Sequence, residues 1–224
     1  MNIFSIGYPK SGTSWVKRLL IDTIPRGVER TGEYERSTDQ SYQIWKRHWS
    51  VKEANRHGID FSKIIFIVRD VRDIIISAMG YFDIDTIDGA IDNISKGDFI
   101  SAAIGELLPW NRYVEEWLGA SAYVVRYKDL LTNDIRETTK ILQYLGVEAL
   151  SEDVRLAVIN NRFDNKKEAL LKNFRKTHDV NDLYDYNFLR VGKTGQYKTK
   201  LNDYHLEIIT KLFGDTMLKL GYNI

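Results

Sequence analysis

Short apolar runs rich in β-branched residues recur along the chain and predict buried strands. They cover residues 3–7, 42–45, 64–68 and 122–125. The run at 64–68 holds five apolar residues without polar alternation, which is typical of a strand covered on both faces of a parallel sheet. The first run breaks at Tyr8-Pro9, which indicates that this strand leads into a loop.

Apolar positions three or four residues apart predict helices between and after these strands. The expected helices cover residues 14–24, 51–57, 70–82, 107–118, 135–145, 152–160 and 204–220. Residues 29–41 are polar and are interpreted as a loop, whereas 83–96 and 175–200 fit no single pattern. Alternating strands and helices predict an α/β fold with three layers, in which helices flank a mostly parallel central sheet. Such sheets bind ligands at the carboxyl ends of their strands.

The length of 224 residues suits one domain that spans 1–224. Lys and Arg number 32 against 31 Asp and Glu, so the net charge of +1 gives no support for a nucleic-acid binder. The chain has no cysteine, and its four histidines show no metal-ligand spacing. No apolar run approaches the roughly 20 residues that span a bilayer, and the N-terminus lacks the pattern of a signal peptide. We therefore expect a cytoplasmic protein that binds neither membrane nor nucleic acid.

The loop between the first strand and the first helix, residues 7–15, carries the features of a phosphate site. Gly12 permits close approach of the backbone, and Thr13 and Ser14 place hydroxyls and amides at a helix N-terminus. Lys10 adds a full positive charge. The loop is not a Walker A motif, because its lysine lies two positions before Gly12 and not directly after it. An ordinary capped strand–turn–helix is the alternative interpretation.

The strand at 64–68 ends in a basic residue, Arg69. A nucleoside-triphosphate enzyme usually has an acidic Mg²⁺ ligand at the corresponding strand end. Ser77 follows eight positions later, on the predicted helix. Taken alone, the charged residues at 69–73 fit solvated ion pairs equally well.

Together, these segments resemble the two signatures by which the sulfotransferase family binds 3′-phosphoadenosine 5′-phosphosulfate (PAPS). Residues 9–15, Pro-Lys-Ser-Gly-Thr-Ser-Trp, resemble the 5′-phosphosulfate loop. Arg69 and Ser77 have the spacing of the 3′-phosphate element. Two signatures in the family's order are much more specific than either alone.

Further segments resemble the family in the same order along the chain. Residues 46–48 are similar to its Lys-Thr-His segment, with Arg47 in place of Thr, and 127–130 are similar to its Tyr-Glu-Asp-Leu segment. Phe163 stands where the family has an adenine-stacking Phe, and residues 190–198 resemble its late Gly-rich loop. Val191 replaces a Lys of that loop, and Gln196-Tyr197 replace Asp-Trp. In the family's dimer motif Asn202-Asp203 replace Thr-Val, so we expect a monomer or a weak homodimer.

The resemblance implies a P-loop-kinase-like sulfotransferase fold and an enzyme that transfers a sulfuryl group from PAPS to a hydroxyl or amine of a small-molecule acceptor. The product of PAPS is adenosine 3′,5′-bisphosphate (PAP), and no metal is required. By the resemblance, His48 is the base, Lys10 stabilises the leaving group and Lys46 binds a sulfuryl oxygen. The implied cofactor-binding residues are Lys10, Ser11, Gly12, Thr13, Ser14, Trp15, Arg69, Ser77, Tyr127, Phe163, Arg190, Val191 and Gly192.

Two other functions stay open at this point: a P-loop kinase that uses ATP and Mg²⁺, and a relative that binds nucleotide without turnover. His57 is a weaker candidate for the base. The acceptor is expected to contact segments 29–45, 83–109 and 164–188. The aromatic residues Tyr34, Tyr42, Trp45, Trp49, Tyr81 and Phe82 suit an apolar or aromatic alcohol, and they suit a sugar equally well.

Overall fold

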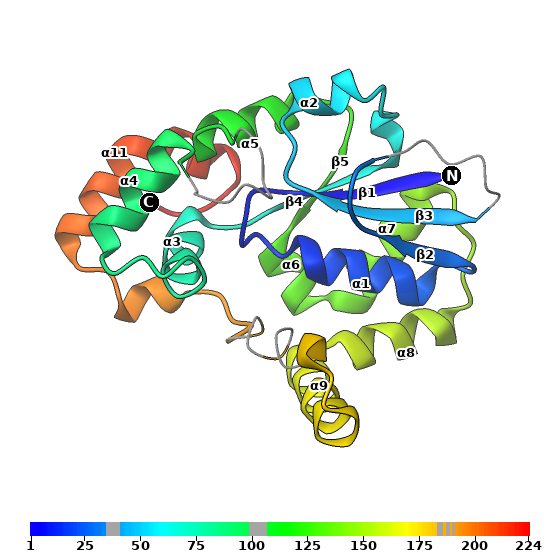
Figure 1. Ribbon diagram of the computed structural model, residues 1–224. Coiled ribbons are helices and arrows are strands. Elements are labelled where there is room, and N and C mark those ends of the chain that lie inside the picture. The colour runs from blue at the N-terminus through cyan, green and yellow to red at the C-terminus, as the bar shows by residue number, and fades with distance from the viewer. Residues whose placement is uncertain (35–40, 99–106, 183–185, 187–188, 190) are drawn as a thin grey trace.

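In the part of the chain that the structure describes, a sheet of five parallel strands forms the centre of the protein (Figure 1). The computed structural model describes residues 1–34, 41–98, 107–182, 186, 189 and 191–224. In chain order the strands are β1 (Asn2–Ile6), β2 (Gly27–Arg30), β3 (Tyr42–Arg47), β4 (Ile64–Val68) and β5 (Tyr123–Arg126). Their order across the sheet is β2-β3-β1-β4-β5, which places β1 at the centre.

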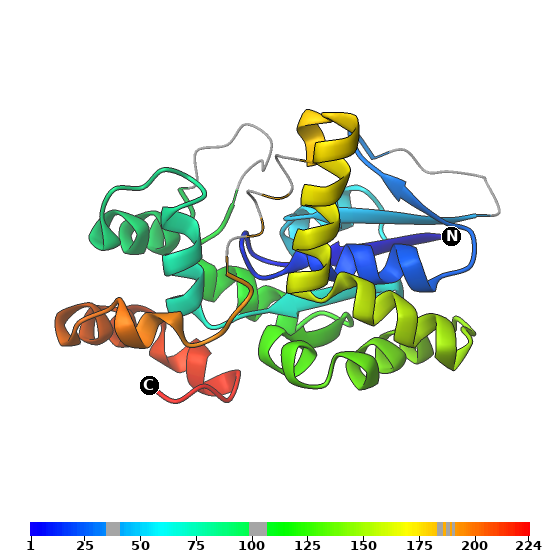
Figure 2. The same cartoon turned by 90° about the horizontal axis from the view of Figure 1, so that it is seen from below.

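Helices cover both faces of the sheet, as Figures 1 and 2 show from two directions. The α-helices are α1 (Thr13–Thr23), α2 (Val51–Arg56), α3 (Val71–Met79), α4 (Ile87–Lys96), α5 (Trp110–Leu118), α6 (Tyr127–Thr132), α7 (Asp134–Leu145), α8 (Ser151–Asn161), α9 (Phe163–Thr177) and α11 (Asp203–Lys219). The described residues also form the short 3₁₀ helices η1 (Phe61–Lys63) and η2 (Gln196–Thr199). Among the described helices, none combines the length and apolar character of a membrane span. The predicted three-layer, parallel α/β fold is confirmed.

The two faces of β4 enter two different hydrophobic cores. Ile65 and Ile67 pack with residues of α1, α7 and α8, whereas Phe66 and Val68 pack with residues of α3, α4, α5 and α11. All five residues of β4 are buried. The unbroken apolar run in the sequence is therefore explained by burial on both faces.

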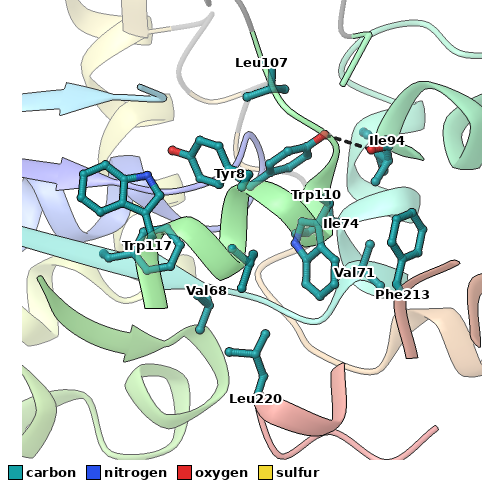
Figure 3. Packing of buried hydrophobic residues seen from close by; sticks show 14 of the residues in the cluster. Tyr8, Val68, Val71, Ile74, Ile94, Leu107, Trp110, Trp117, Phe213 and Leu220 are labelled. Carbon is teal, nitrogen blue, oxygen red and sulfur yellow. Dashed lines mark hydrogen bonds between the residues drawn. The ribbon is translucent and has the colours of Figure 1, made fainter. Parts of the chain in front are cut away.

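The larger core anchors the backbone around the strand ends (Figure 3). Tyr8 lies just beyond β1, after Gly7; it is almost fully buried and its hydroxyl donates to the carbonyl of Ile94 at 3.4 Å. Trp117 of α5 is fully buried, and its indole N–H donates to the carbonyl of Trp49 at 3.1 Å. The chain segments that follow β1 and β3 are thus held by core residues.

Two sequence-based expectations are wrong in their bounds. Residues 29 and 30 belong to β2 and not to a loop, because they pair with β3 at an exposed sheet edge where polar side chains are stable. The helix expected over 107–118 begins at Trp110, since Pro109 is its N-cap. The unassigned stretch 83–96 contains α4, whose buried residues are Ala90, Ile91 and Ile94.

Candidate active site

The carboxyl ends of β1, β3, β4 and β5 meet along one edge of the sheet and open into a cleft of about 1290 Å³. Most of the predicted site residues line this cleft, although they come from distant parts of the chain. Those that line it are Lys10, Gly12, Thr13, Ser14, Trp15, Lys46, His48, Arg69, Ser77, Tyr127, Phe163, Val191 and Gly192. Ser11 is only 1% exposed and is not among the lining residues, and Arg190 lies outside the described residues.

The loop after β1 exposes the N-terminus of α1 to the cleft. Gly12 is the N-cap with φ 106°, and a Cβ at this position would lie 2.7 Å from Cδ2 of Tyr127. Within the described part of the chain, no side chain caps the helix and no acidic residue lies in its first turn. The partial positive charge of this helix end is therefore left for an anion.

Lys10 lies in the same loop in a left-handed conformation, with φ 69°. Its ammonium nitrogen lies 3.7 Å from the centre of the Tyr81 ring, in a cation–π contact. Tyr81 follows α3 and also lines the cleft. The contact thus joins the phosphate-site loop to the segment that follows α3.

His48 follows β3 and is oriented by a hydrogen bond to the loop after β1. Its Nδ1 lies 2.6 Å from the carbonyl oxygen of Gly7. A carbonyl only accepts, so Nδ1 carries the proton and Nε2 keeps its lone pair. The pKa of His48 is lowered to about 4, mainly by burial and also by the charges of Lys46, Lys10 and Arg47, against the opposing effect of the Gly7 carbonyl. The imidazole is therefore neutral at physiological pH.

Arg69 and Asp73 hold the late loop against the end of β4. Arg69 donates to the carbonyl of Lys10 at 3.0 Å and to that of Lys193 at 3.0 Å, and it lies over the ring of Tyr127. The carboxylate of Asp73 accepts hydrogen bonds from two backbone amides of the late loop, Gly195 at 2.8 Å and residue 196 at 2.9 Å. Burial raises the pKa of Asp73, whereas the Gly195 amide and Arg69 favour its charged form.

The part of the cleft near α6 and α9 is aromatic. Trp15 and Tyr127 meet edge to face with ring centres 5.6 Å apart. Phe163 begins α9 and packs against Gly192, where an added Cβ would lie 2.3 Å from its Cδ2. The indole nitrogen of Trp15 is buried and has no hydrogen-bond partner among the described residues.

A second aromatic group lines the cleft on the side of α2. The rings of Trp49 and His57 stack with centres 4.4 Å apart, and Tyr34 meets His57 edge to face at 5.9 Å. Trp45 and Tyr42, both suggested as pocket residues, do not line the cleft, since Trp45 is only 4% exposed and Tyr42 packs against the core on the other side of the sheet.

Asp73 is a site residue that sequence reasoning missed. Its charged neighbours in sequence suggested solvated ion pairs, but Asp73 is only 1% exposed. The loop amides that it binds lie more than a hundred positions further along the chain. Within the described residues, no group of three His, Asp or Glu side chains has an arrangement that could hold a metal ion.

Comparison with known proteins gives a consistent result. Residues 28–221 match the profile of the sulfotransferase domain family. Among curated proteins, the chain is 26% identical to sulfotransferase 1A1 of Rattus norvegicus, covering 85% of this chain and 76% of that protein. It is 23% identical to 3-alpha-hydroxysteroid sulfotransferase of Cavia porcellus, covering 95% and 82%.

Two solved structures share the fold at low sequence identity. Mouse sulfotransferase SULT7A1, crystallised with PAP, superposes with a TM-score of 0.76 at 17% identity and covers 96% of this chain and 83% of that one. Retinol dehydratase in complex with androsterone and inactive cofactor PAP superposes with a TM-score of 0.69 at 14% identity, covering 96% and 80%. These likenesses confirm the predicted fold class.

Proposed function

The chain belongs to the sulfotransferase family, and from this premise we propose that its cleft transfers a sulfuryl group from PAPS to the hydroxyl of a small-molecule acceptor, with His48 as the base. As a PAPS-dependent sulfotransferase, it uses a donor with three anionic groups. The main observation in support of the proposal is the tautomer and orientation of the His48 imidazole. Its Nδ1–H is engaged by Gly7, so Nε2 is the nitrogen that can accept a proton.

The residues of the cleft fit PAPS. The uncapped N-terminus of α1 and the ammonium groups of Lys10 and Lys46 suit the 5′-phosphosulfate. Gly12 lines the cleft and has no room for a side chain, because a Cβ there would lie 2.7 Å from Tyr127. The cleft of about 1290 Å³ has room for a nucleotide and a second small molecule.

Arg69 and Ser77 are proposed to hold the 3′-phosphate, which distinguishes PAPS from ATP. Both line the cleft, and Arg69 retains a buried Nε–H without a partner in the described part of the chain. Arg190, Val191 and Gly192 of the late loop would close on the same phosphate. Retinol dehydratase and SULT7A1, whose structures contain PAP, support this use of the fold.

Trp15 and Phe163 are proposed to stack on the adenine, with Tyr127 at its edge. All three line the cleft, and Trp15 and Tyr127 already meet edge to face. The unpartnered indole N–H of Trp15 offers a donor to the nucleotide. Aromatic stacking distinguishes poorly between nucleobases, so the 3′-phosphate would supply most of the selectivity for PAPS over other nucleotides.

The chemical step requires one proton acceptor and stabilisation of two oxygens. When bound, PAPS supplies the sulfuryl group: a bond forms between its sulfur and the acceptor oxygen as the bond from sulfur to the bridging oxygen breaks. Nε2 of His48 takes the acceptor's proton. Lys10 stabilises charge on the leaving oxygen, for which its ammonium must leave the Tyr81 ring, and Lys46 binds a sulfuryl oxygen.

A pKa of about 4 makes His48 a weak base in the empty cleft. Lys10, Lys46 and Arg47 all lower this pKa by their charge. Anionic groups of the donor bound to Lys10 and Lys46 would offset the charge of these lysines, so the pKa of His48 should rise when the donor binds. Binding of the donor would thus activate the base.

Transfer of an isotopically labelled sulfuryl group from PAPS to a panel of phenols, sterols, aliphatic alcohols and amines tests the proposal. In His48→Asn the amide retains an N–H donor for Gly7 but loses the basic nitrogen, so turnover should fall by about 10²–10⁴. Binding of PAP should stay within about twofold of wild type, since the introduced amide keeps the loop in place. The matched control is His178→Asn, which replaces an exposed histidine at the end of α9, outside the cleft.

A comparison with His57→Asn decides between the two histidines of the cleft. Loss of turnover in His57→Asn with full turnover in His48→Asn would mean that the base has been assigned to the wrong residue. Absence of transfer to every acceptor class, in a protein that binds PAP, would favour a relative that binds nucleotide without turnover.

A further inference from the structure

Arg47 occupies the position next to His48, and its guanidinium is held rigidly. It contacts two indole rings, with Cζ 4.6 Å from the centre of Trp45 and 5.1 Å from that of Trp49. Nη1 donates to the carbonyl of Lys46 at 2.9 Å, and Nη2 donates to the carbonyl of Gly32 at 2.6 Å. A planar guanidinium held by two aromatic contacts and two hydrogen bonds is pre-organised for a planar partner at its edge.

Arg47 is half-buried, yet it forms no ion pair with any residue that the structure describes. The two carbonyls use two of its five N–H groups. Burial lowers the pKa of Arg47. A cation withdrawn from water without an acidic partner is unusual, because its desolvation is normally offset by a counter-charge.

Arg72 provides an internal comparison. It also lies over an aromatic ring, with Cζ 4.1 Å from the centre of Tyr197. Its guanidinium pairs with the carboxylate of Asp70, at 2.7 Å from Nη2. Burial works to lower the pKa of Arg72, but the hydrogen bond and charge of Asp70 outweigh it and the pKa is raised. Among the residues that the structure describes, Arg72 thus has a carboxylate partner and Arg47 has none.

The position of Arg47 assigns it to the acceptor end of the cleft. Arg47, Gly32 and Trp49 all line the cleft together with His48, and the charge of Arg47 is close enough to lower the pKa of His48. Glu33 also lines the cleft, but it is exposed and forms no ion pair with Arg47 among the described contacts. Apart from Lys46, which precedes Arg47 on β3, the residues proposed to bind the nucleotide come from other segments: the loop after β1, α1, the end of β4, α3, α6, α9 and the late loop.

We propose that the acceptor carries a carboxylate, which pairs with Arg47 while its hydroxyl meets His48. This inference rests on the proposed function and specifies its substrate class. The rings of Tyr34, Trp49 and His57 line the same part of the cleft, so the body of the acceptor is flat and apolar. An aromatic hydroxy acid combines these features. A carboxylate is the planar, two-oxygen partner that a guanidinium edge binds best.

The test uses pairs of ligands that differ only in the carboxylate. Several aromatic hydroxy acids of different length, among them 3-(4-hydroxyphenyl)propionic acid, are each compared with their methyl esters. Binding to the PAP-loaded protein is measured by calorimetry, and kcat/KM for sulfuryl transfer is measured with PAPS. At least one acid should bind about 10- to 100-fold more tightly than its ester and be preferred by a similar factor in kcat/KM.

Arg47→Met should remove this preference, because the acid loses its partner while the ester does not. The kcat/KM for the preferred acid should fall by about 10- to 100-fold, and that for its ester by no more than about threefold. Arg47→Lys keeps a point charge but not the planar edge and should lie between the two. Arg56→Met, which replaces an exposed arginine of α2 outside the cleft, is the matched control.

The outcomes separate this inference from the proposed function. If transfer occurs but no acid is preferred to its ester in binding or turnover, the carboxylate proposal is wrong and sulfuryl transfer stands. If an acid binds selectively through Arg47 but no transfer follows, the inference holds and the proposed chemistry fails. If Arg47→Met retains the preference at unchanged PAP affinity, another residue binds the carboxylate and the assignment of Arg47 is wrong.

Discussion

Replacing His48 by Asn should change how the stability of the protein depends on pH. Burial lowers the pKa of His48 from 6.5 to about 4 in the folded protein. The unfolded chain therefore binds a proton at a higher pH than the folded one does. Stability from the neutral imidazole is fully present above the unfolded-state pKa of 6.5 and is lost as the pH falls toward 4.

The size of this effect follows from the two pKa values. At about pH 5, nearly every unfolded molecule has a protonated His48, whereas few folded molecules do. The difference removes about 2 kcal/mol of unfolding free energy relative to about pH 7.5. The amide introduced by His48→Asn does not titrate and still donates to the carbonyl of Gly7, so the variant lacks this contribution while other acid-sensitive groups stay the same.

Urea unfolding at about pH 7.5 and about pH 5 measures the effect, by comparison of wild type with His48→Asn and with the exposed control His178→Asn. Wild type and the control should lose about 2 kcal/mol more than His48→Asn between the two pH values. Equal losses in all three proteins would mean that His48 is not held neutral by burial. The orientation inferred from its bond to Gly7 would then need revision.

Three further substitutions test the framework of the site. Gly12→Ala places a Cβ 2.7 Å from Tyr127 at φ 106°, so urea unfolding should show a loss of about 1–3 kcal/mol, and unchanged stability would contradict the tight approach. Gly192→Ala brings a Cβ within 2.3 Å of Phe163, so calorimetry should show PAP binding weakened by about tenfold or more. Unchanged PAP affinity would mean that the late loop takes no part in binding. Asp73→Asn replaces one of the two acceptor oxygens by a donor, which should cost about 1–3 kcal/mol of unfolding free energy and also weaken PAP binding. If the variant and wild type bind PAP with equal affinity, anchoring of the late loop by Asp73 does not contribute to nucleotide binding.

The buried parts of the fold could be predicted from the sequence, because burial on both faces leaves a clear pattern. The five apolar residues of β4 are the best example. The strand β2 lies at the sheet edge with mostly exposed side chains, so its sequence does not differ from that of a polar loop. The helix α9 buries only Leu170 among its described residues and carries many charges, so apolar periodicity could not reveal it.

The candidate site was predictable where its residues follow strands directly. Lys10, His48, Arg69 and Tyr127 come after β1, β3, β4 and β5, and parallel strands bring their carboxyl ends to one edge. Contacts between distant segments were not predictable. The indole contacts of Arg47, the bond of His48 to the Gly7 carbonyl and the loop amides on Asp73 depend on packing that sequence spacing does not encode.

Calorimetric titration with PAP, ADP and ATP, each with and without Mg²⁺, shows whether the cleft binds a nucleotide through its 3′-phosphate. Binding of PAP should be independent of Mg²⁺ and about tenfold or more tighter than binding of ADP, if Arg69 and Ser77 bind the 3′-phosphate as proposed. Preference for ATP with Mg²⁺, or equal affinity for PAP and ADP, would contradict this proposal.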